Sequence, residues 1–167
     1  MTNPFIWGAG TANNGLYIPS FNLLTTEIES LTTGSIVVSS VGGTSGLFSV
    51  TQTGQAVLAE LFFSFGNPGV ASALSNGACI TGWFLPQANS TVFESKTLVN
   101  SRNPDFIVPL PATTIPNTPI TPFKALGPVI LPALPFFVMI QNNTGRTTGN
   151  GGTTPPYLVC APYTVQY

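Results

Sequence analysis

The amino-acid sequence predicts an all-β fold, an antiparallel two-sheet sandwich with jelly-roll-like topology. The chain carries 16 prolines and 17 glycines among 167 residues, spread along its whole length. No segment sustains the 3.6-residue apolar period of an amphipathic helix. Instead, about eight short runs of β-branched and aromatic residues alternate with Gly/Pro turns, a pattern typical of sandwiches and jelly rolls. We therefore expect a single sandwich domain over residues 21–167, preceded by an extended N-terminal arm over residues 1–20.

The strand around which the domain is predicted to be organised lies within residues 127–140, a run without any charged residue. Its prolines, Pro128, Pro132 and Pro135, exclude a helix interior because each lacks a backbone donor and clashes with the preceding turn. The uninterrupted apolar part, residues 136–140, has the length of one buried strand. The Asn-Thr-Gly sequence that follows favours a turn.

The predicted arm is rich in Gly and Asn, but it also carries large apolar side chains that follow no period. Such groups need a surface to cover, so we expect the arm to pack along its own domain or on a neighbouring molecule. After the arm, residues 23–28 fit either a short helical turn or a strand. The large apolar residues of the arm are Phe5, Ile6, Trp7, Tyr17 and Ile18.

The assignment of residues 56–65 is ambiguous by periodicity, because both a strand and a helix would group their apolar residues on one face. Three phenylalanines within four positions, followed by Gly-Asn-Pro-Gly, favour the strand. Residues 111–126, which hold four prolines, predict a polyproline-like loop. Residues 145–152 predict a glycine-rich hairpin loop. The other predicted strands cover residues 35–41, 47–51, 78–85, 90–99, 104–111, 157–161 and 163–167.

The low charge of the chain excludes several classes of partner. Charged residues make up 5% of the sequence, against about 25% in ordinary soluble domains. The four Lys and Arg residues are scattered and the net charge is −1, so we expect no nucleic-acid partner. No uninterrupted apolar segment reaches the ~18–20 residues of a spanning helix, and the N-terminus lacks a signal-peptide pattern. Such a protein is kept soluble by Thr, Ser, Asn and Gln, or by incorporation into a larger assembly.

The sequence offers no catalytic constellation. It contains no histidine, the residue most often used as a general base and metal ligand. Glu27 and Glu29 are spaced to share a strand face and bind a cation, but a solvated pair is the favoured interpretation. Glu60 and Glu94 form the one pair on neighbouring candidate strands that a glycosidase would need. We expect no enzyme activity, no catalytic residues, no metal and no cofactor.

Cys79 and Cys160 are the only cysteines. Two isolated cysteines cannot build a zinc site. Free thiols in a protein made in a reducing cytoplasm are the favoured interpretation. A disulfide between them is left open.

Aromatic residues are the candidates for interaction with a partner. Trp83, beside Phe84 on a predicted strand, is the best candidate for a platform that stacks on a sugar, with Arg102 and Asp105 as accompanying polar groups. Packing inside the domain is the favoured alternative, because phenylalanine dominates the aromatic residues. The candidate interaction residues are Phe5, Trp7, Tyr17 and Trp83.

The C-terminal part of the chain resembles small virion proteins of tailed bacteriophages that are encoded among the structural genes. The resemblance is carried by Pro-Asp-Phe-Ile-Val-Pro-Leu at residues 104–110 and by the proline-rich run at residues 127–138. Gln-Asn-Asn-Thr-Gly at residues 141–145 and Ala-Pro-Tyr-Thr-Val-Gln at residues 161–166 complete it. These motifs are structural, so the resemblance implies no catalytic residue.

The resemblance implies a capsid-associated structural protein, either a cement (decoration) protein on the shell or a jelly-roll shell subunit. It further implies synthesis in the host cytoplasm, a location in the virion, and two partners: a major capsid protein and the chain itself. By analogy to cement proteins, a homotrimer is the expected stoichiometry. The alternative is a carbohydrate- or receptor-binding β-sandwich module of a virion tail or fibre.

Overall fold

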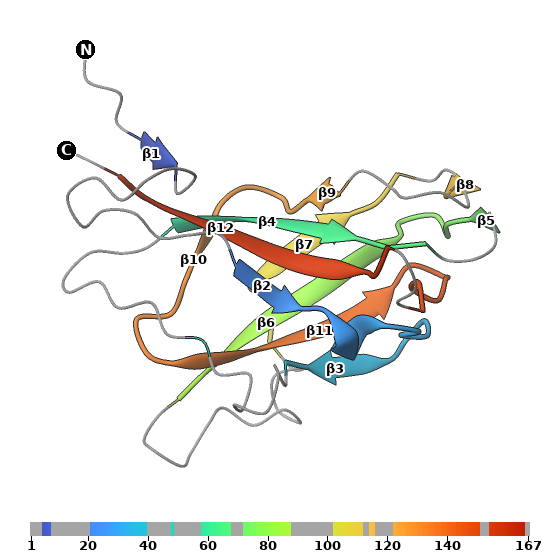
Figure 1. Cartoon of the computed structure of the whole chain (residues 1–167), viewed down its shortest axis with the longest axis horizontal. Helices are drawn as coiled ribbons and strands as arrows, with labels where there is room; N and C mark the ends of the chain where they lie inside the picture. Colours follow the sequence, from blue (N-terminus) through green and yellow to red (C-terminus); the bar gives the residue numbers. More distant parts are fainter. Residues whose placement is uncertain are drawn as a thin grey trace.

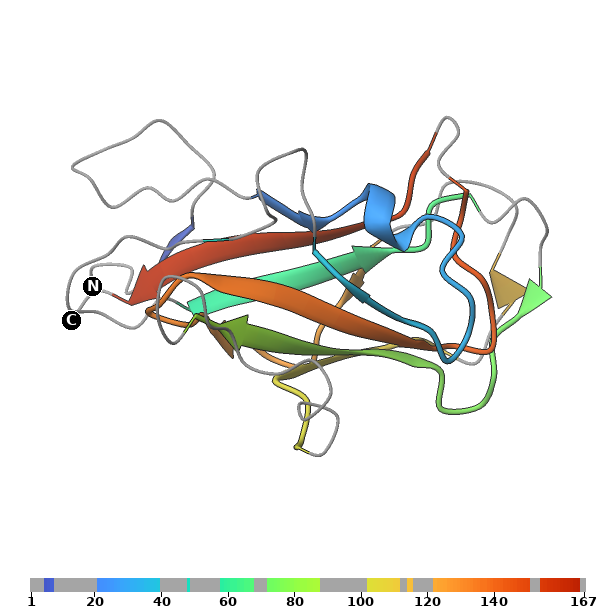
Figure 2. The ribbon, with the colours of Figure 1, turned by 90° about the horizontal axis from the view of Figure 1, so that it is seen from below.

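The structure is a computed structural model that describes residues 5–7, 21–39, 48, 58–67, 72–87, 102–111, 114–115, 122–150 and 154–165. These residues form two antiparallel sheets that pack face to face, which confirms the predicted all-β sandwich. Figure 1 shows the long strands of the two sheets crossing one another, and Figure 2 shows the same layers after a turn of 90°. The jelly-roll topology stays a prediction.

The first sheet, sheet A, is built around the long neighbouring strands β4 and β12. Strands β1 and β2 pair with opposite ends of the other edge of β12, and β9 and β10 pair with the other edge of β4. The strands of sheet A are β1 (Phe5–Trp7), β2 (Phe21–Leu24), β4 (Leu58–Ser64), β9 (Phe123–Lys124), β10 (Val129–Ile130) and β12 (Tyr157–Val165).

The second sheet, sheet B, has the order β3-β11-β6-β7, with β11 and β6 paired along their full length. Its strands are β3 (Ile36–Val38), β6 (Cys79–Pro86), β7 (Phe106–Pro109) and β11 (Phe136–Asn143). A separate short ladder joins β5 (Ser72–Ala73) to β8 (Thr114–Ile115), and a single 3-10 turn, η1 (Thr26–Ile28), follows β2.

The core lies between the sheets and is rich in phenylalanine. Alternate residues of β4 and β11 are fully buried, as expected for strands with one face on the core. The rings of Phe84 and Phe136 meet edge to face with centroids 5.2 Å apart, and Phe63 and Phe65 meet at 5.3 Å. Aromatic pairs in this geometry add to the stability that area burial alone provides.

Several predicted elements are confirmed. The ambiguous residues 56–65 contain strand β4, and the organising strand at residues 136–140 is the first part of β11. For residues 23–28 the sequence left a strand and a helical turn open, and the structure contains both: β2 ends at Leu24 and η1 begins at Thr26. The predicted strands at residues 90–99 and most of 47–51 lie outside the described residues.

Two parts of the C-terminal half differ from the prediction. The loop at residues 111–126 contains the short strands β8 and β9. The predicted strands at 157–161 and 163–167 form one strand, β12, with Pro162 inside it. Pro162 is tolerated there because Cys160 is the last residue that pairs with β2 and Tyr163 the first that pairs with β1. The missing N–H therefore interrupts neither of these two ladders, while along its other edge β12 keeps Pro162 opposite Ala59 of β4.

The N-terminal arm also differs in part. Residues 5–7 were expected outside any strand pattern, but they form β1, which pairs with Val165–Tyr163 at the end of β12. This part of the arm therefore extends sheet A of its own chain. Most of the remaining arm lies outside the described residues.

The two sheets are joined at two places by backbone hydrogen bonds. At the first place, the N–H of Leu126 in the β9–β10 connection donates to the carbonyl of Ile107 in β7, at 2.8 Å. At the second place, the segment after β11 crosses to sheet A, where the N–H of Gly149 donates to the carbonyl of Phe65, directly after β4, at 2.8 Å. These two links fix the position of one sheet relative to the other.

Buried polar side chains stabilise the crossing after β11. The Thr148 hydroxyl accepts a 2.8 Å hydrogen bond from the N–H of Leu31 and donates to the carbonyl of Ile28. The side-chain amide of Asn142 donates to the carbonyls of Leu31 and Arg146 at 2.8 and 2.7 Å. Because both side chains are buried and bonded, they hold the crossing without leaving polar groups unsatisfied.

Candidate functional site

Trp83 does not form the exposed platform that the sequence suggested. Its side chain is only 5% exposed, on the face of sheet B opposite to the main core. Leu85 and Met139 are fully buried beside it, and Val38 and Phe137 pack against the group. The ring therefore presents almost no surface to a ligand. Packing, the favoured alternative for the aromatic residues, is what Trp83 does in the folded chain.

Arg102 and Asp105 lie beside Trp83, as the sequence grouping implied, but they bond to the chain itself. Arg102 Nη1 donates to Asp105 Oδ1 at 2.8 Å, and Arg102 Nη2 donates to the carbonyl of Phe84 at 2.9 Å. Asp105 Oδ2 accepts from the N–H of Phe84 at 2.7 Å, and Trp83 Nε1 donates to the carbonyl of Arg102 at 3.4 Å. This cluster joins the segment before β7 to β6.

The other candidate interaction residues lie in the arm. Phe5 and Trp7 are the ends of β1, and their backbones pair with Val165 and Tyr163. Tyr17 lies outside the described residues. The structure therefore brings Phe5 and Trp7 to one short strand and does not bring Trp83, on sheet B, to the same sheet.

Glu27 and Glu60, one member of each candidate acidic pair, are engaged inside the chain. Glu60 Oε1 accepts from Lys124 Nζ at 2.5 Å, across the pair β4–β9. Glu27 Oε2 accepts from the N–H of Thr25 at 3.0 Å, at the start of η1. The possible partner Glu94 lies outside the described residues. Among the residues that the structure describes, no group of three or more His, Cys, Asp or Glu could hold a metal ion.

Both cysteines are free thiols on different sheets. Burial raises the pKa of Cys160 to about 12, and burial also raises the pKa of Cys79, which is half-buried. Desolvation disfavours the thiolate in both cases. Neither cysteine has the lowered pKa of a reactive nucleophile.

The outer face of sheet A is a surface with functional potential, because several of its cross-strand rows are apolar around the ion pair Glu60–Lys124. Ile130 of β10 lies opposite Leu58 of β4. Farther along β4, Phe62 lies opposite Val159 of β12, which in turn lies opposite Asn22 of β2. Exposed faces of antiparallel sheets are usually polar. This face therefore differs from an ordinary solvated surface.

At and beyond the β10 edge of this face, apolar side chains project into solvent. Leu126 and Ile130 are each 67% exposed, and Leu134 is 52% exposed. They stand four residues apart along a segment that includes the edge strand β10, and no charged residue lies between them. We call Leu126, Ile130 and Leu134 the apolar edge.

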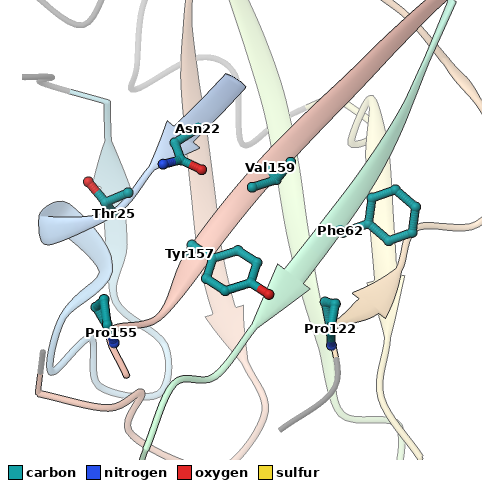
Figure 3. A pocket seen from close by; sticks show the side chains of 7 residues that line it. All are labelled: Asn22, Thr25, Phe62, Pro122, Pro155, Tyr157 and Val159. Atoms are coloured by element: carbon teal, nitrogen blue, oxygen red, sulfur yellow. The ribbon is translucent and has the colours of Figure 1, made fainter. Parts of the chain in front are cut away.

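At the other end of the face lies a groove of about 430 Å³. Val159 and Phe62 are neighbours across β12 and β4, and Tyr157 follows on the same face of β12. Figure 3 shows the Tyr157 ring between the Asn22–Thr25 side and the Phe62 side, with a proline on each side. None of the lining residues is charged. The groove is lined by Asn22, Thr25, Phe62, Pro122, Pro155, Tyr157 and Val159.

Sequence reasoning missed both features for identifiable reasons. Ile130 and Leu134 of the apolar edge lie in the proline-rich run that was singled out, and Leu126 directly precedes it, but periodicity did not show which of these residues face solvent. The groove combines residues from β2, β4 and β12, which are far apart in the sequence. The one signal in the sequence was the alternation of side chains along β4. It places Phe62 on the outer face of the sheet and the next residue, Phe63, on the core face.

Comparisons of the chain with protein-family models, with curated proteins and with solved structures found no match. Within the described ranges, no helix combines the length and hydropathy that crossing a membrane requires. Interpretation of the site therefore depends on its geometry and chemistry.

Proposed function

We propose that this chain is a structural subunit of a bacteriophage virion, which acts by packing against copies of itself and against a shell protein. The observation that carries the proposal is the apolar edge. Three large aliphatic side chains, all more than half exposed, stand along the segment that leads from β9 through the edge strand β10 toward β11. Large exposed apolar side chains that recur along one segment supply the kind of apolar surface that protein–protein contacts use.

The surroundings of β10 favour contact through side chains over the addition of further strands. Natural edge strands are protected by charges, bulges or prolines. Here Pro128 and Pro132 flank Val129–Ile130 in the sequence, so backbone pairing with another chain cannot extend far along this edge. A partner would instead cover the exposed side chains of Leu126, Ile130 and Leu134.

The charged residues add little to such a contact. The pairs Arg102–Asp105 and Lys124–Glu60 form within the chain and involve four of its nine charged residues, 4 basic plus 5 acidic. Exposed ion pairs contribute only ~0–1 kcal/mol each, whereas apolar burial contributes ~25 cal/mol per Å². Apolar area is therefore the main source of association energy.

The resemblance to virion proteins of tailed bacteriophages gives the proposal its biological setting. It supports a cement (decoration) protein or a jelly-roll shell subunit, assembled in the host cytoplasm and located in the virion. It also supports a homotrimer and contact with a major capsid protein. The role requires no catalysis and no cofactor. The carbohydrate-binding alternative is less favoured, because Trp83, its best candidate residue, is buried.

Sedimentation velocity of the purified chain tests the proposal. The wild-type chain should form a discrete oligomer, and the double variant Leu126→Ser, Ile130→Ser should shift toward monomer because it removes the most exposed apolar side chains. Ile36→Ser is the matched control, since Ile36 is 41% exposed on β3 of the other sheet. A second arm measures co-sedimentation with the shell protein encoded near this chain.

The control variant should assemble like the wild type and bind the shell protein equally well. If the double variant associates and co-sediments as the wild type does, the apolar edge is not the contact surface and the proposal fails.

A further inference from the structure

We propose that the groove on sheet A receives the proline-repeat segment at residues 116–121 of a second copy of this chain. This inference rests on the proposed self-association and names one contact through which it occurs. The groove lies at the far end of β4 from Ile130, so its contact is separate from the apolar edge.

The chemistry of the groove fits an uncharged, proline-containing extended chain. Two aromatic rings, Phe62 and Tyr157, together with Pro122 and Pro155, provide apolar walls of the kind that pack on proline rings. The Asn22 amide and the Thr25 and Tyr157 hydroxyls can bond to backbone carbonyls. A polyproline helix makes no internal hydrogen bonds, so its carbonyls remain free for such contacts.

The chain itself contains a segment with the matching pattern. Residues 116–122 read Pro-Asn-Thr-Pro-Ile-Thr-Pro, with a proline at every third position and no charge. A polyproline helix has three residues per turn, so these prolines would line one of its faces. The absence of charge matters because the lining residues of the groove are also uncharged.

The direction of the chain at Pro122 favours a second copy over the same copy. Pro122 is part of the groove wall and leads directly into β9, which runs antiparallel to β4. The proline ring fixes φ near about −65° and biases the preceding residue, Thr121, toward an extended conformation. A reversal of the chain into its own groove at this point is therefore disfavoured. A polyproline helix of six residues would span roughly 19 Å at ~3.1 Å per residue, enough to reach an adjacent molecule.

A peptide titration tests this contact apart from assembly. The receptor is the full chain carrying Pro116→Ala and Pro119→Ala, which weakens its own segment and leaves the groove available. The probe is a fluorescent peptide with the sequence of residues 113–122, followed by anisotropy. The same peptide with alanine at positions 116 and 119 is the control ligand. A panel of neutral oligosaccharides is tested as competitor.

We expect saturable binding of the proline peptide and at least a tenfold loss with the alanine peptide. Added to the receptor, Tyr157→Ser should cause a similar loss by removing a wall. Asn22→Trp is the second variant; it fills the groove from an exposed position without removing core packing. Ile36→Trp adds the same ring to the other sheet and should leave binding unchanged.

The inference is overturned if the folded receptor does not bind the peptide, if groove variants bind it as well as the control, or if oligosaccharides displace it at the groove. Sedimentation velocity of the receptor separates this outcome from failure of the proposed function. If the proline peptide does not bind while the wild-type chain assembles through the apolar edge, only the groove contact is wrong.

Discussion

The ring of Phe106 in β7 lies against the backbone of Gly82, its direct cross-strand partner in β6. A Cβ atom added at Gly82 would come within 2.0 Å of the ring. The same ring is 4% exposed and stands 5.5 Å, centroid to centroid, from that of Phe84. Gly82 therefore occupies the middle of an apolar strand because the space of its missing side chain is filled by Phe106.

Replacement Gly82→Ala should lower the free energy of unfolding by about 1–3 kcal/mol, the usual range for overpacking a core. Urea denaturation of the two proteins measures the difference. In a Phe106→Ala background, the same replacement should have little effect, because the ring that it meets is gone. Equal effects in both backgrounds would show that the ring is not the cause.

Replacement Thr148→Val should destabilise the crossing after β11. It preserves shape but removes a hydroxyl that accepts from Leu31 N–H and donates to Ile28 O. A buried polar group that is left without its hydrogen-bond partner lowers the free energy of unfolding by about 1–3 kcal/mol. Thr147→Val is the matched control, since the adjacent Thr147 is exposed. Thermal or urea unfolding that ranks the two variants equally would contradict this role for Thr148.

Stability should fall at high pH because of Cys160. Burial raises the pKa of this thiol from 9.0 to about 12 in the folded chain. The contribution of the neutral Cys160 thiol to the free energy of unfolding is complete below pH 9. It is lost as the pH rises toward 12, because the thiol ionises at lower pH in the unfolded chain than in the folded chain. The loss between these values should be smaller in Cys160→Ala than in the wild type. Cys79→Ala is the comparison and should reduce the loss less, because Cys79 is only half-buried. Urea midpoints across this pH range provide the measurement.

The elements with strong local signals were predictable from sequence. Residues 136–140 were expected to be extended, because the prolines before them exclude a helix through the whole run and the remaining apolar part has the length of one strand. The structure places them in β11. Residues 56–65 carried two competing periods, and the strand prevailed because Leu61 and Phe63 alternate on the core face. Pro162 was taken as a break, since a local rule does not reveal that β12 has two separate edge partners at this point.

The candidate surfaces were less predictable, because exposure depends on which sheet face receives a cover. Trp83 and Phe62 are both aromatic residues on strands, and sequence alone does not distinguish them. In the fold, Trp83 is buried beside Met139, whereas Phe62 is half-buried at a groove. The groove itself depends on cross-strand neighbours, such as Asn22 and Val159, that only the pairing of β2 with β12 brings together.

The central claim is that apolar surface, with little help from charge, holds this protein to its partners. The direct test is sedimentation of the isolated oligomer in graded sodium chloride and, separately, in graded urea below the unfolding transition. At about 1 M salt the Debye length falls to ~3 Å, which removes most surface electrostatics. The oligomer should persist in salt and dissociate in urea. Dissociation by salt alone would show that the few charged residues govern assembly, and it would contradict this account.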